Sequence, residues 1–242
     1  MERRCLAFIG LLLIVSVAIS HTNIARAQGD PNKVFVEKDG VLVVEAENAV
    51  SQSHFNVRQW YLTTVDKTPN VKPDGDENHA ETASGKAYIE ILPDTRRTHG
   101  DRLKSGENFT NTPGKMAIIY YPVQINKPGR YYFWARICCT GSEDNGIHVG
   151  IDGTWPESGQ RMQFIGKHGQ WQWDSKQRTD KVHTGVKYKF YLDVKRPGRH
   201  MIMISMREDG FELDKWMMTL ERDPMRSQST EMGPPESETI RR

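Results

Sequence analysis

The chain has 242 residues and a formal net charge of +2, with charged residues of both signs spread along it. This near balance speaks against a nucleic-acid-binding protein, which needs a clustered basic face. A chain of this length can bury a substantial core, and all-β folds of this size often form a single domain.

Residues 1–27 are predicted to form a signal peptide. A basic start is followed by an apolar run over residues 6–20, and residues 25–27 (Ala-Arg-Ala) offer a small-x-small cleavage site. The apolar run is shorter than the roughly 20 residues of a membrane span, although an uncleaved anchor is the alternative. We therefore expect a secreted, extracytoplasmic protein, in the periplasm or outside the cell, with no membrane contact after cleavage.

Strand patterns fill residues 28–222, which we predict to be one domain. Runs that alternate apolar and polar residues, or that are rich in β-branched and aromatic residues, are typical of strands, and the Pro-Gly and Asp-Gly pairs between them are typical of turns. We find no convincing amphipathic helix. The pattern predicts an all-β fold, a sandwich or a barrel. The expected strands cover residues 41–47, 86–92, 116–125, 130–138, 146–152, 187–194, 200–206 and 211–220.

Three segments fall outside this pattern. Residues 66–83 and 93–113 are polar insertions, long enough to be functional loops. Residues 223–242 are rich in Ser, Glu, Pro and Arg, so we expect a disordered tail there.

A set of short motifs follows in a fixed order between residues 41 and 220. They are Val-Glu-Ala-Glu-Asn (44–48), Ala-Ser-Gly-Lys-Ala-Tyr-Ile (83–89), Tyr-Pro-Val-Gln-Ile (121–125), Pro-Gly-Arg-Tyr-Tyr-Phe-Trp-Ala-Arg (128–136), Val-Gly-Ile-Asp-Gly (149–153), Gln-Trp-Gln-Trp (170–173), Pro-Gly-Arg-His-Met-Ile (197–202) and Glu-Asp-Gly-Phe-Glu-Leu-Asp (208–214). This order resembles the family 6 and family 35 carbohydrate-binding modules and their galactose-binding-like relatives. The resemblance implies a β-sandwich (jelly roll) of two antiparallel sheets, here with long loop insertions. It also implies sugar binding without catalysis and a structural calcium ion.

Glu45 and Glu47 are candidate calcium ligands. They lie two residues apart on one expected strand, so their carboxylates share a face. Two carboxylates on a core face need compensation, and a hard cation with oxygen ligands, such as Ca²⁺, supplies it. The resemblance implies that Asp214, at the start of the last strand, completes the site with backbone carbonyls. The alternative is that both glutamates line a solvent face.

Aromatic side chains are candidates for stacking on sugar rings. Trp171 and Trp173 share a strand face, and Trp155 follows an Asp-Gly turn. The resemblance implies a site on loops at one end of the sandwich, with Trp171 as the first candidate and Trp155 as the second. The opposing ring is expected from Trp60, Tyr61 or Tyr88. Core packing is the alternative for each of these rings.

Polar candidates accompany the rings. Arg96 and Arg97 stand close to His99 in the second insertion and could hold a uronic acid or a sulfated sugar by charge-assisted hydrogen bonds. A solvated loop is the alternative. Glu212 stands where the resemblance implies a ligand-binding Asn just before the last strand.

We therefore predict a secreted, non-catalytic carbohydrate-binding module, a monomer that binds a polysaccharide or oligosaccharide and acts beside a partner enzyme. The sequence has no Gly-x-Ser-x-Gly elbow, no His-Glu-x-x-His motif and no Gly-rich phosphate loop. Two alternatives stay open. One is a jelly-roll polysaccharide lyase or glycoside hydrolase, whose paired carboxylates can be distant in sequence. The other is a structural or adhesive surface protein.

Overall fold

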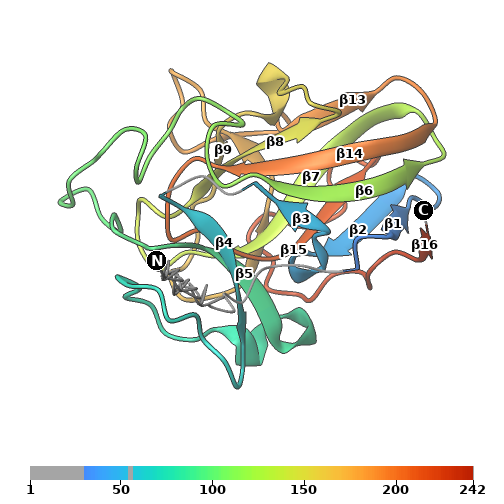
Figure 1. Ribbon diagram of the computed structural model, residues 1–242. Helices are drawn as coiled ribbons and strands as arrows, with labels where there is room; N and C mark the ends of the chain where they lie inside the picture. The colour runs from blue at the N-terminus through green and yellow to red at the C-terminus, as the bar shows by residue number, and fades with distance from the viewer. Residues whose placement is uncertain (1–29, 54–56, 242) are drawn as a thin grey trace, which may run out of the picture.

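Two β-sheets pack face to face in the computed structural model, which describes residues 30–53 and 57–241 (Figure 1). The predicted signal peptide, residues 1–27, lies outside the described residues. Within the described ranges the helices are three-residue 3-10 turns, and none is long and apolar enough to cross a membrane. These turns are η1 (Ala46–Asn48), η2 (Ala80–Thr82), η3 (Ser84–Lys86) and η4 (Glu157–Gly159).

The larger sheet has nine strands in the order β12-β11-β9-β8-β14-β6-β1-β16, with β3 also paired to β6. Its pairs are antiparallel except for β1 and β6, which run parallel. The strands are β1 (Lys33–Val36), β3 (Ser51–Gln52), β6 (Ile119–Ile125), β8 (Gly146–Ile151), β9 (Met162–Gln163), β11 (Lys176–Gln177), β12 (Val186–Lys187), β14 (Gly198–Met206) and β16 (Thr239–Arg241).

The smaller sheet has seven strands in the order β10-β7-β15-β5-β4, with β13 also paired to β7 and β2 to β15. All of its pairs are antiparallel. The strands are β2 (Val41–Glu45), β4 (Gln59–Thr64), β5 (Ala87–Leu92), β7 (Gly129–Cys138), β10 (Gln172–Asp174), β13 (Tyr191–Val194) and β15 (Glu212–Thr219).

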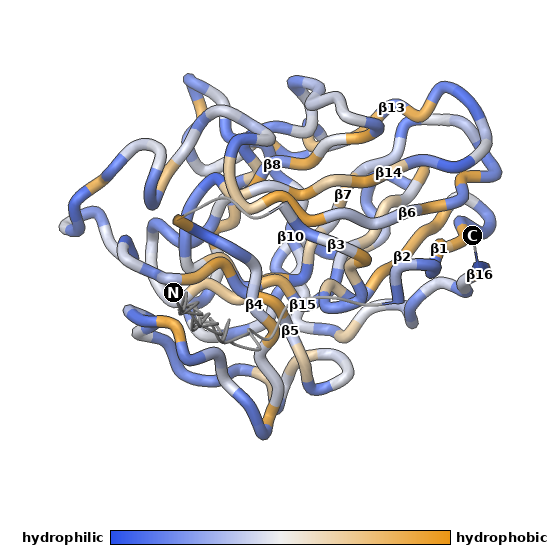
Figure 2. The backbone as a smooth tube through the Cα atoms, viewed as in Figure 1, coloured by the Kyte–Doolittle hydropathy of each residue, from blue (hydrophilic) through white to orange (hydrophobic). Residues whose placement is uncertain are grey.

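The core lies between the two sheets, where hydrophobic stretches of facing strands meet (Figure 2). Strand β7 shows the reason: Tyr131 and Phe133 belong to the central core, whereas Tyr132 and Trp134 pack in a second cluster on the outer side. Successive side chains of a strand point to opposite faces, so a strand buried on both sides carries aromatic residues at neighbouring positions. The arrangement confirms the predicted β-sandwich.

The C-terminal segment covers part of the outer face of the smaller sheet. The backbone N–H of Trp173 donates to the Ser229 carbonyl at 2.9 Å, and the N–H of Ser237 donates to the Val43 carbonyl at 2.9 Å. Beyond it, β16 pairs with β1. This differs from the disordered tail expected for residues 223–242. The segment gives little hydrophobic signal of its own, but its backbone pairs with groups that β10 and β2 would otherwise leave open.

His148 on β8 is fully buried and neutral. Its Nε2 lies 3.1 Å from the Thr110 carbonyl oxygen, and its Nδ1 accepts the backbone N–H of Arg161 at 3.1 Å. Burial, together with the positive charges of Arg207 and Arg161, lowers the pKa of His148 to about 4. The hydrogen bond to Thr110 opposes this shift only in part.

We expect His148 to make the protein sensitive to mild acid. On acidification His148 is protonated near pH 6.5 in the unfolded chain, but only near pH 4 in the folded chain. In this window the group therefore lowers the free energy of unfolding by about 1.4 kcal/mol for each pH unit of acidification. Urea unfolding at pH 4–7 should give slopes that differ by about this amount between the natural protein and His148→Gln. Buried carboxylates with a raised pKa, such as Glu47 and Glu212, contribute slopes of the opposite sign, but they do so equally in both proteins. Replacement of the exposed His168 by Gln is the control and should keep the natural slope, and a His148→Gln variant that also keeps it would contradict the assignment.

Candidate ligand-binding cavity

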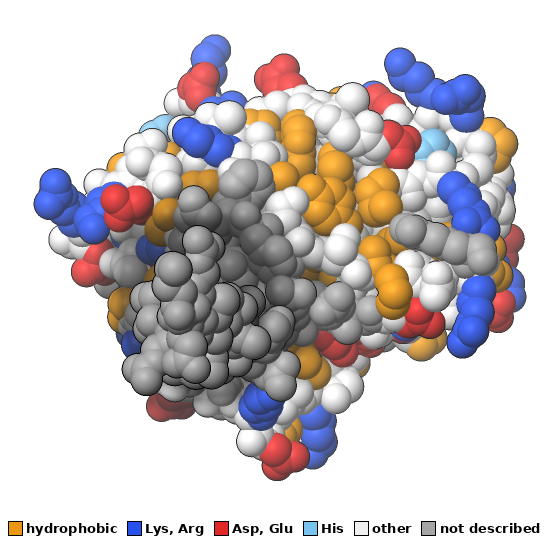
Figure 3. Space-filling view, in the orientation of Figure 1, with side chains coloured by type: hydrophobic (Ala, Val, Ile, Leu, Met, Phe, Trp, Pro, Cys, Tyr) orange, Lys and Arg blue, Asp and Glu red, His pale blue; other side chains and the backbone are white. Residues whose placement is uncertain are grey.

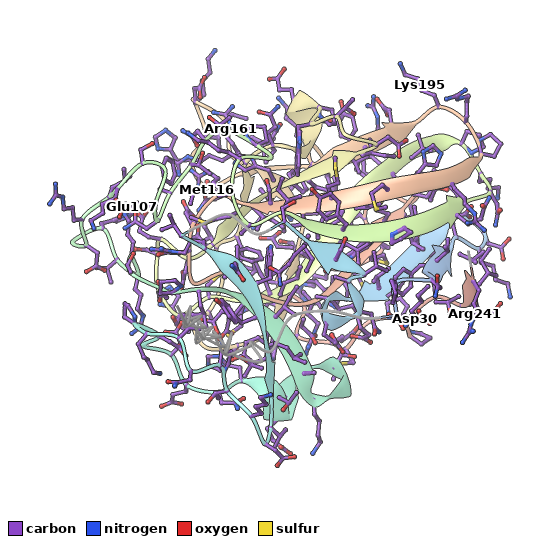
Figure 4. The ribbon with its side chains drawn as sticks, in the orientation of Figure 1. Asp30, Glu107, Met116, Arg161, Lys195 and Arg241 are labelled. Atoms are coloured by element: carbon purple, nitrogen blue, oxygen red, sulfur yellow. The ribbon has the colours of Figure 1, made fainter. Side chains whose placement is uncertain are left out.

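A cavity of about 500 Å³ opens among the loops at one end of the sandwich. The long β5–β6 connection, residues 93–118, forms one wall and projects from the sheets in Figure 1. Glu107 on this connection lies on the opposite side of the molecule from Asp30 and Arg241 (Figure 4). The β7–β8, β9–β10 and β11–β12 loops and the end of β14 supply the other walls.

The cavity lining combines charged and imidazole side chains with apolar ones. A volume of this size lies in the usual range for small-molecule sites. The polar residues of the lining include Arg96, His99, Glu143, His168, Arg178, His183, Arg207 and Glu208, and the apolar ones include Leu103, Phe109, Phe164 and Ile165.

Arg96 and Glu143 form a buried ion pair in the cavity wall, and His99 also contacts the Glu143 carboxylate. Arg96 is 7% exposed, and its Nε has no hydrogen-bond partner among the described residues. A buried N–H without a partner costs free energy, so the protein itself does not fully satisfy this guanidinium.

A second buried pair, Arg207 with Glu208, stands at the end of β14. The Arg207 guanidinium lies over the Phe109 ring, 4.9 Å from its centroid, and it donates to Gln163 Oε1 at 3.3 Å. Its Nε is buried and lacks a hydrogen-bond partner within the part of the chain that the structure describes. Burial raises the pKa of Glu208, and the charge of Arg207 opposes this shift. The cavity therefore offers two incompletely satisfied guanidinium groups.

The two arginines predicted together are separated by the fold. Arg96 faces the cavity, whereas Arg97 turns to the outer side, where its NH2 lies 2.6 Å from Asp76 Oδ1 and 3.3 Å from Thr140 Oγ1. Neighbouring residues of an extended segment point to opposite sides, which accounts for the split.

Four of the predicted stacking residues are buried away from any open groove, namely Trp60, Tyr88, Trp171 and Trp173. Trp171 is 3% exposed and meets Tyr88 edge-on, with ring centroids 5.2 Å apart. Trp173 lies beneath the C-terminal segment and donates its indole N–H to the Glu231 carbonyl at 3.0 Å. Trp60 lies in the central core and donates to the Ala117 carbonyl at 2.7 Å. These rings differ from the expected positions because segments remote in sequence cover them.

Trp155 is half-buried on the outer face of the larger sheet, with its indole against the backbones of Gly114 and Gly150. Hydrophobic side chains gather on the face that β6 and β14 present in Figure 3. Trp155 does not line the loop-end cavity. It is the predicted stacking indole that keeps partial access to solvent.

Glu212 is fully buried on the outer side of the smaller sheet and not in the cavity. His79 Nδ1 lies 2.9 Å from its Oε2 and 3.0 Å from its Oε1. Burial raises the pKa of Glu212 to about 7, while the hydrogen bond and charge of His79 oppose the shift. The predicted ligand contact thus lies in a covered cluster with Glu90 and Asp76.

The predicted calcium ligands come from three elements that meet on the same outer face. Glu45 ends β2, Glu47 lies in η1 and Asp214 lies in β15, so the two glutamates do not share one strand as expected. Burial, and the nearby carboxylates of Glu45 and Asp214, raise the pKa of Glu47 to about 8. Ser84 joins the set through its N–H, which donates to Asp214 Oδ1 at 2.8 Å, and its hydroxyl, which donates to Glu45 Oε1 at 2.8 Å.

Unpartnered oxygens make this set suitable for a hard cation. Glu45 Oε2 and Glu47 Oε2 are buried without a hydrogen-bond partner among the residues that the structure describes. Lys215 and Arg136 neutralise part of the charge, because Lys215 Nζ lies 2.9 Å from Glu45 Oε1 and Arg136 contacts Asp214 Oδ2. The donors are carboxylates and a hydroxyl, which are the oxygen ligands that Ca²⁺ takes.

Sequence reasoning found Arg96 but missed most of the cavity. The sequence pattern predicts a turn at Glu143. It predicts the end of a strand, followed by an Asp-Gly turn, at Arg207 and Glu208. The available signal is a run of charged residues next to a strand end. That signal is also typical of ordinary solvated loops, so it does not identify a cavity without the fold.

Comparison with known proteins gives a family for most of the described chain. The model of the glycosyl hydrolase family 115 C-terminal domain matches residues 34–236. An uncharacterized protein of Formosa agariphila is 53% identical over 188 residues, which cover 78% of this chain and 46% of that protein. The chain thus spans about half the length of the curated relative that it matches.

Solved structures with a similar strand arrangement include proteins of carbohydrate metabolism. A family 35 carbohydrate-binding module from Clostridium thermocellum is 13% identical, with 74% of this chain and 96% of that chain covered and a TM-score of 0.40. A Paenibacillus xanthan lyase is 13% identical, with 74% of this chain and 13% of that chain covered and a TM-score of 0.41.

Proposed function

Because the chain belongs to the family of glycosyl hydrolase family 115 C-terminal domains, we propose that this carbohydrate-related β-sandwich binds an oligosaccharide or polysaccharide without cleaving it. The loop-end cavity is the proposed binding site. The observation that carries the proposal is the gathering of three arginines, Arg96, Arg178 and Arg207, in the lining of one cavity.

The lining favours a sugar that carries a carboxylate or a sulfate. Arg96 and Arg207 are partly neutralised by Glu143 and Glu208, whereas Arg178 lines the same cavity and makes no side-chain ion pair with another described residue. Guanidinium groups bind planar or tetrahedral oxyanions with charge-assisted hydrogen bonds. The glutamates accept hydrogen bonds from hydroxyl groups, and the partly exposed Phe109 ring offers an apolar surface for sugar C–H groups.

Replacing Arg178 by alanine is expected to weaken binding of an acidic oligosaccharide by about tenfold or more, because it removes a charged hydrogen-bond donor. Isothermal titration calorimetry with uronic acid-containing, sulfated and neutral oligosaccharides measures the effect. Arg196→Ala is the matched control, since Arg196 is exposed in the β13–β14 turn at the opposite end of the sandwich and should leave affinity unchanged.

Two results would overturn the proposal. One is the absence of binding to every oligosaccharide in the panel by the natural protein. The other is the appearance of new reducing ends or unsaturated products on incubation with a polysaccharide, which would make the cavity an active site. A role beside a partner enzyme, a secreted location and a monomeric state are parts of the proposal that need their own measurements.

A structural calcium ion at Glu45, Glu47 and Asp214 is the second part of the proposal. The buried, unpartnered carboxylate oxygens of the two glutamates support it. Such an ion would hold η1 and η3 against β15 on the outer face of the smaller sheet. It would contribute to stability rather than to contact with the sugar, because none of the three residues lines the cavity.

Addition of excess EGTA is expected to lower the melting temperature of the calcium-loaded protein by several degrees, because a ligand bound only to the folded state stabilises it. The Glu47→Gln variant should show a smaller response than the natural protein. The control is Glu81→Gln, since Glu81 is exposed and pairs with Lys86 close by. If the natural protein and Glu47→Gln responded equally to EGTA, the proposal of a calcium ion at Glu45, Glu47 and Asp214 would be wrong.

A further inference from the structure

A second group of carboxylates is buried where β5 and β15 pair. Glu90 and Glu212 stand directly opposite each other in the register of these strands, on the outer face of the smaller sheet. They are 2% and 0% exposed. Two like charges directly opposite each other in a sheet are destabilising, and burial increases the cost. This pair therefore needs a counter-charge or a proton.

Asp76 adds a third carboxylate to this group. It lies in the insertion that connects β4 to η2, and one oxygen from each of Asp76, Glu90 and Glu212 lies within 4.8 Å of the other two. Oxygens that share one Ca²⁺ are each about 2.3–2.6 Å from the ion, so they stand at most about 5 Å apart. The three oxygens already have the spacing of ligands around a single calcium ion.

The hydrogen bonds of this group leave oxygens free in its interior. Glu90 Oε1 and Asp76 Oδ2 are buried and lack hydrogen-bond partners among residues 30–53 and 57–241. The other Asp76 oxygen accepts a hydrogen bond from Thr140 Oγ1 at 2.6 Å. Arg97 pairs with Asp76, and His79 pairs with Glu212. Glu90 makes no ion pair within the described chain.

We propose that Asp76, Glu90 and Glu212 bind a divalent cation, Ca²⁺, at a site separate from the Glu45, Glu47 and Asp214 set. The observation that points to a ligand is the unpartnered, buried Glu90 Oε1 in a group whose three carboxylates each bring an oxygen within 4.8 Å of the other two. Three hard oxygen donors select Ca²⁺ over softer metals. This inference does not depend on sugar binding.

A zinc site is the competing use of the same region. His79, Cys138 and Glu212 also offer donor atoms within 4.8 Å of one another. The Nδ1 of His79 is already engaged by Glu212 at 2.9 Å, and Cys138 packs in an apolar cluster with Tyr88 and Trp171. A zinc ion on these three residues would leave the unpartnered oxygens of Glu90 and Asp76 without a ligand role. The calcium site accounts for these oxygens and is therefore preferred.

The cation would join the insertion to the sheet and, through it, to the cavity wall. Asp76 holds Arg97, and Arg97 adjoins Arg96 in the lining. The same ion that neutralises Glu90 and Glu212 therefore fixes the base of the loop that carries Arg96.

Calcium stoichiometry of the full chain tests the proposal. Equilibrium dialysis followed by elemental analysis is expected to give two Ca²⁺ per chain for the natural protein, one for Glu90→Gln, one for Glu47→Gln and none for the double variant. Asp76→Asn should behave like Glu90→Gln and serves if that variant does not fold. Glu81→Gln is the control and should keep both ions.

Hydrogen exchange of residues 66–86 provides a second readout. Calcium is expected to slow exchange there in the natural protein and in Glu47→Gln, but not in Glu90→Gln. A single ion per chain that Glu90→Gln removes and Glu47→Gln retains would support this site and overturn the other one. Unchanged stoichiometry in both Glu90→Gln and Asp76→Asn would overturn the proposal. So would the absence of Ca²⁺, or zinc binding that His79→Gln abolishes and Glu90→Gln leaves intact.

Discussion

Replacing Trp216 by alanine is expected to lower the free energy of unfolding by about 3–5 kcal/mol. Trp216 on β15 is fully buried at the centre of the sandwich. Its ring stacks on Phe133, with centroids 5.6 Å apart and an interplanar angle of 17°, and meets Tyr121 edge-on at 5.1 Å. Removal of the indole leaves a cavity between two sheets that cannot close without moving both, so the loss should fall at the upper end of core truncations.

Guanidinium chloride unfolding followed by circular dichroism measures this loss. Trp155→Ala is the matched control, because it removes the same side chain from a half-buried position on the outer face of the larger sheet. We expect it to cost less than half as much. Similar losses for both variants would mean that the core does not centre on Trp216.

Replacing Arg58 by methionine is expected to destabilise the protein by about 3–5 kcal/mol, because it leaves Asp209 as an unpaired buried charge. Arg58 and Asp209 are 4% and 0% exposed in their side chains and pair at 2.8 Å. Asp209 Oδ2 also accepts hydrogen bonds from the N–H and the hydroxyl of Thr95, each at 2.8 Å. Thr95 immediately precedes Arg96, so we also expect weaker oligosaccharide binding.

Chemical unfolding and calorimetric titration of the same variant separate the two effects. Arg130→Met is the control, since the Arg130 and Asp193 side chains are both about half exposed and pair at 2.8 Å. Exposed ion pairs contribute about 0–1 kcal/mol. If Arg58→Met changed stability no more than Arg130→Met, Asp209 would not depend on Arg58.

The sandwich could be predicted because the signal is local. Alternation on β7 separates Tyr131 and Phe133 from Tyr132 and Trp134, and the structure places these two pairs on opposite sides of the strand. The meeting of Glu45, Glu47 and Asp214 was also accessible, through the resemblance, although Glu47 lies in a 3-10 turn and not on the strand.

The sites that depend on remote segments could not be predicted. Residues 66–86 cover Trp171, and residues 224–237 cover Trp173. The polar composition of both segments gives no local sign that they pack on a tryptophan. Likewise, Glu90, Glu212 and Asp76 come from three distant positions, and only strand register brings the first two together. A sequence pattern reports which side of a strand is apolar, but not which loop will cover it.

The pairing of β16 with β1 has a consequence for architecture. It brings the two ends of the described chain together, with Asp30 and Arg241 near each other and remote from Glu107 (Figure 4). A neighbouring unit tethered near Asp30 or Arg241 would therefore lie at the end of the sandwich remote from the cavity, and it would leave the cavity open to solvent. With a single attachment point, the sandwich could rotate about the tether, and the loop-end cavity, at the far end, would change position most.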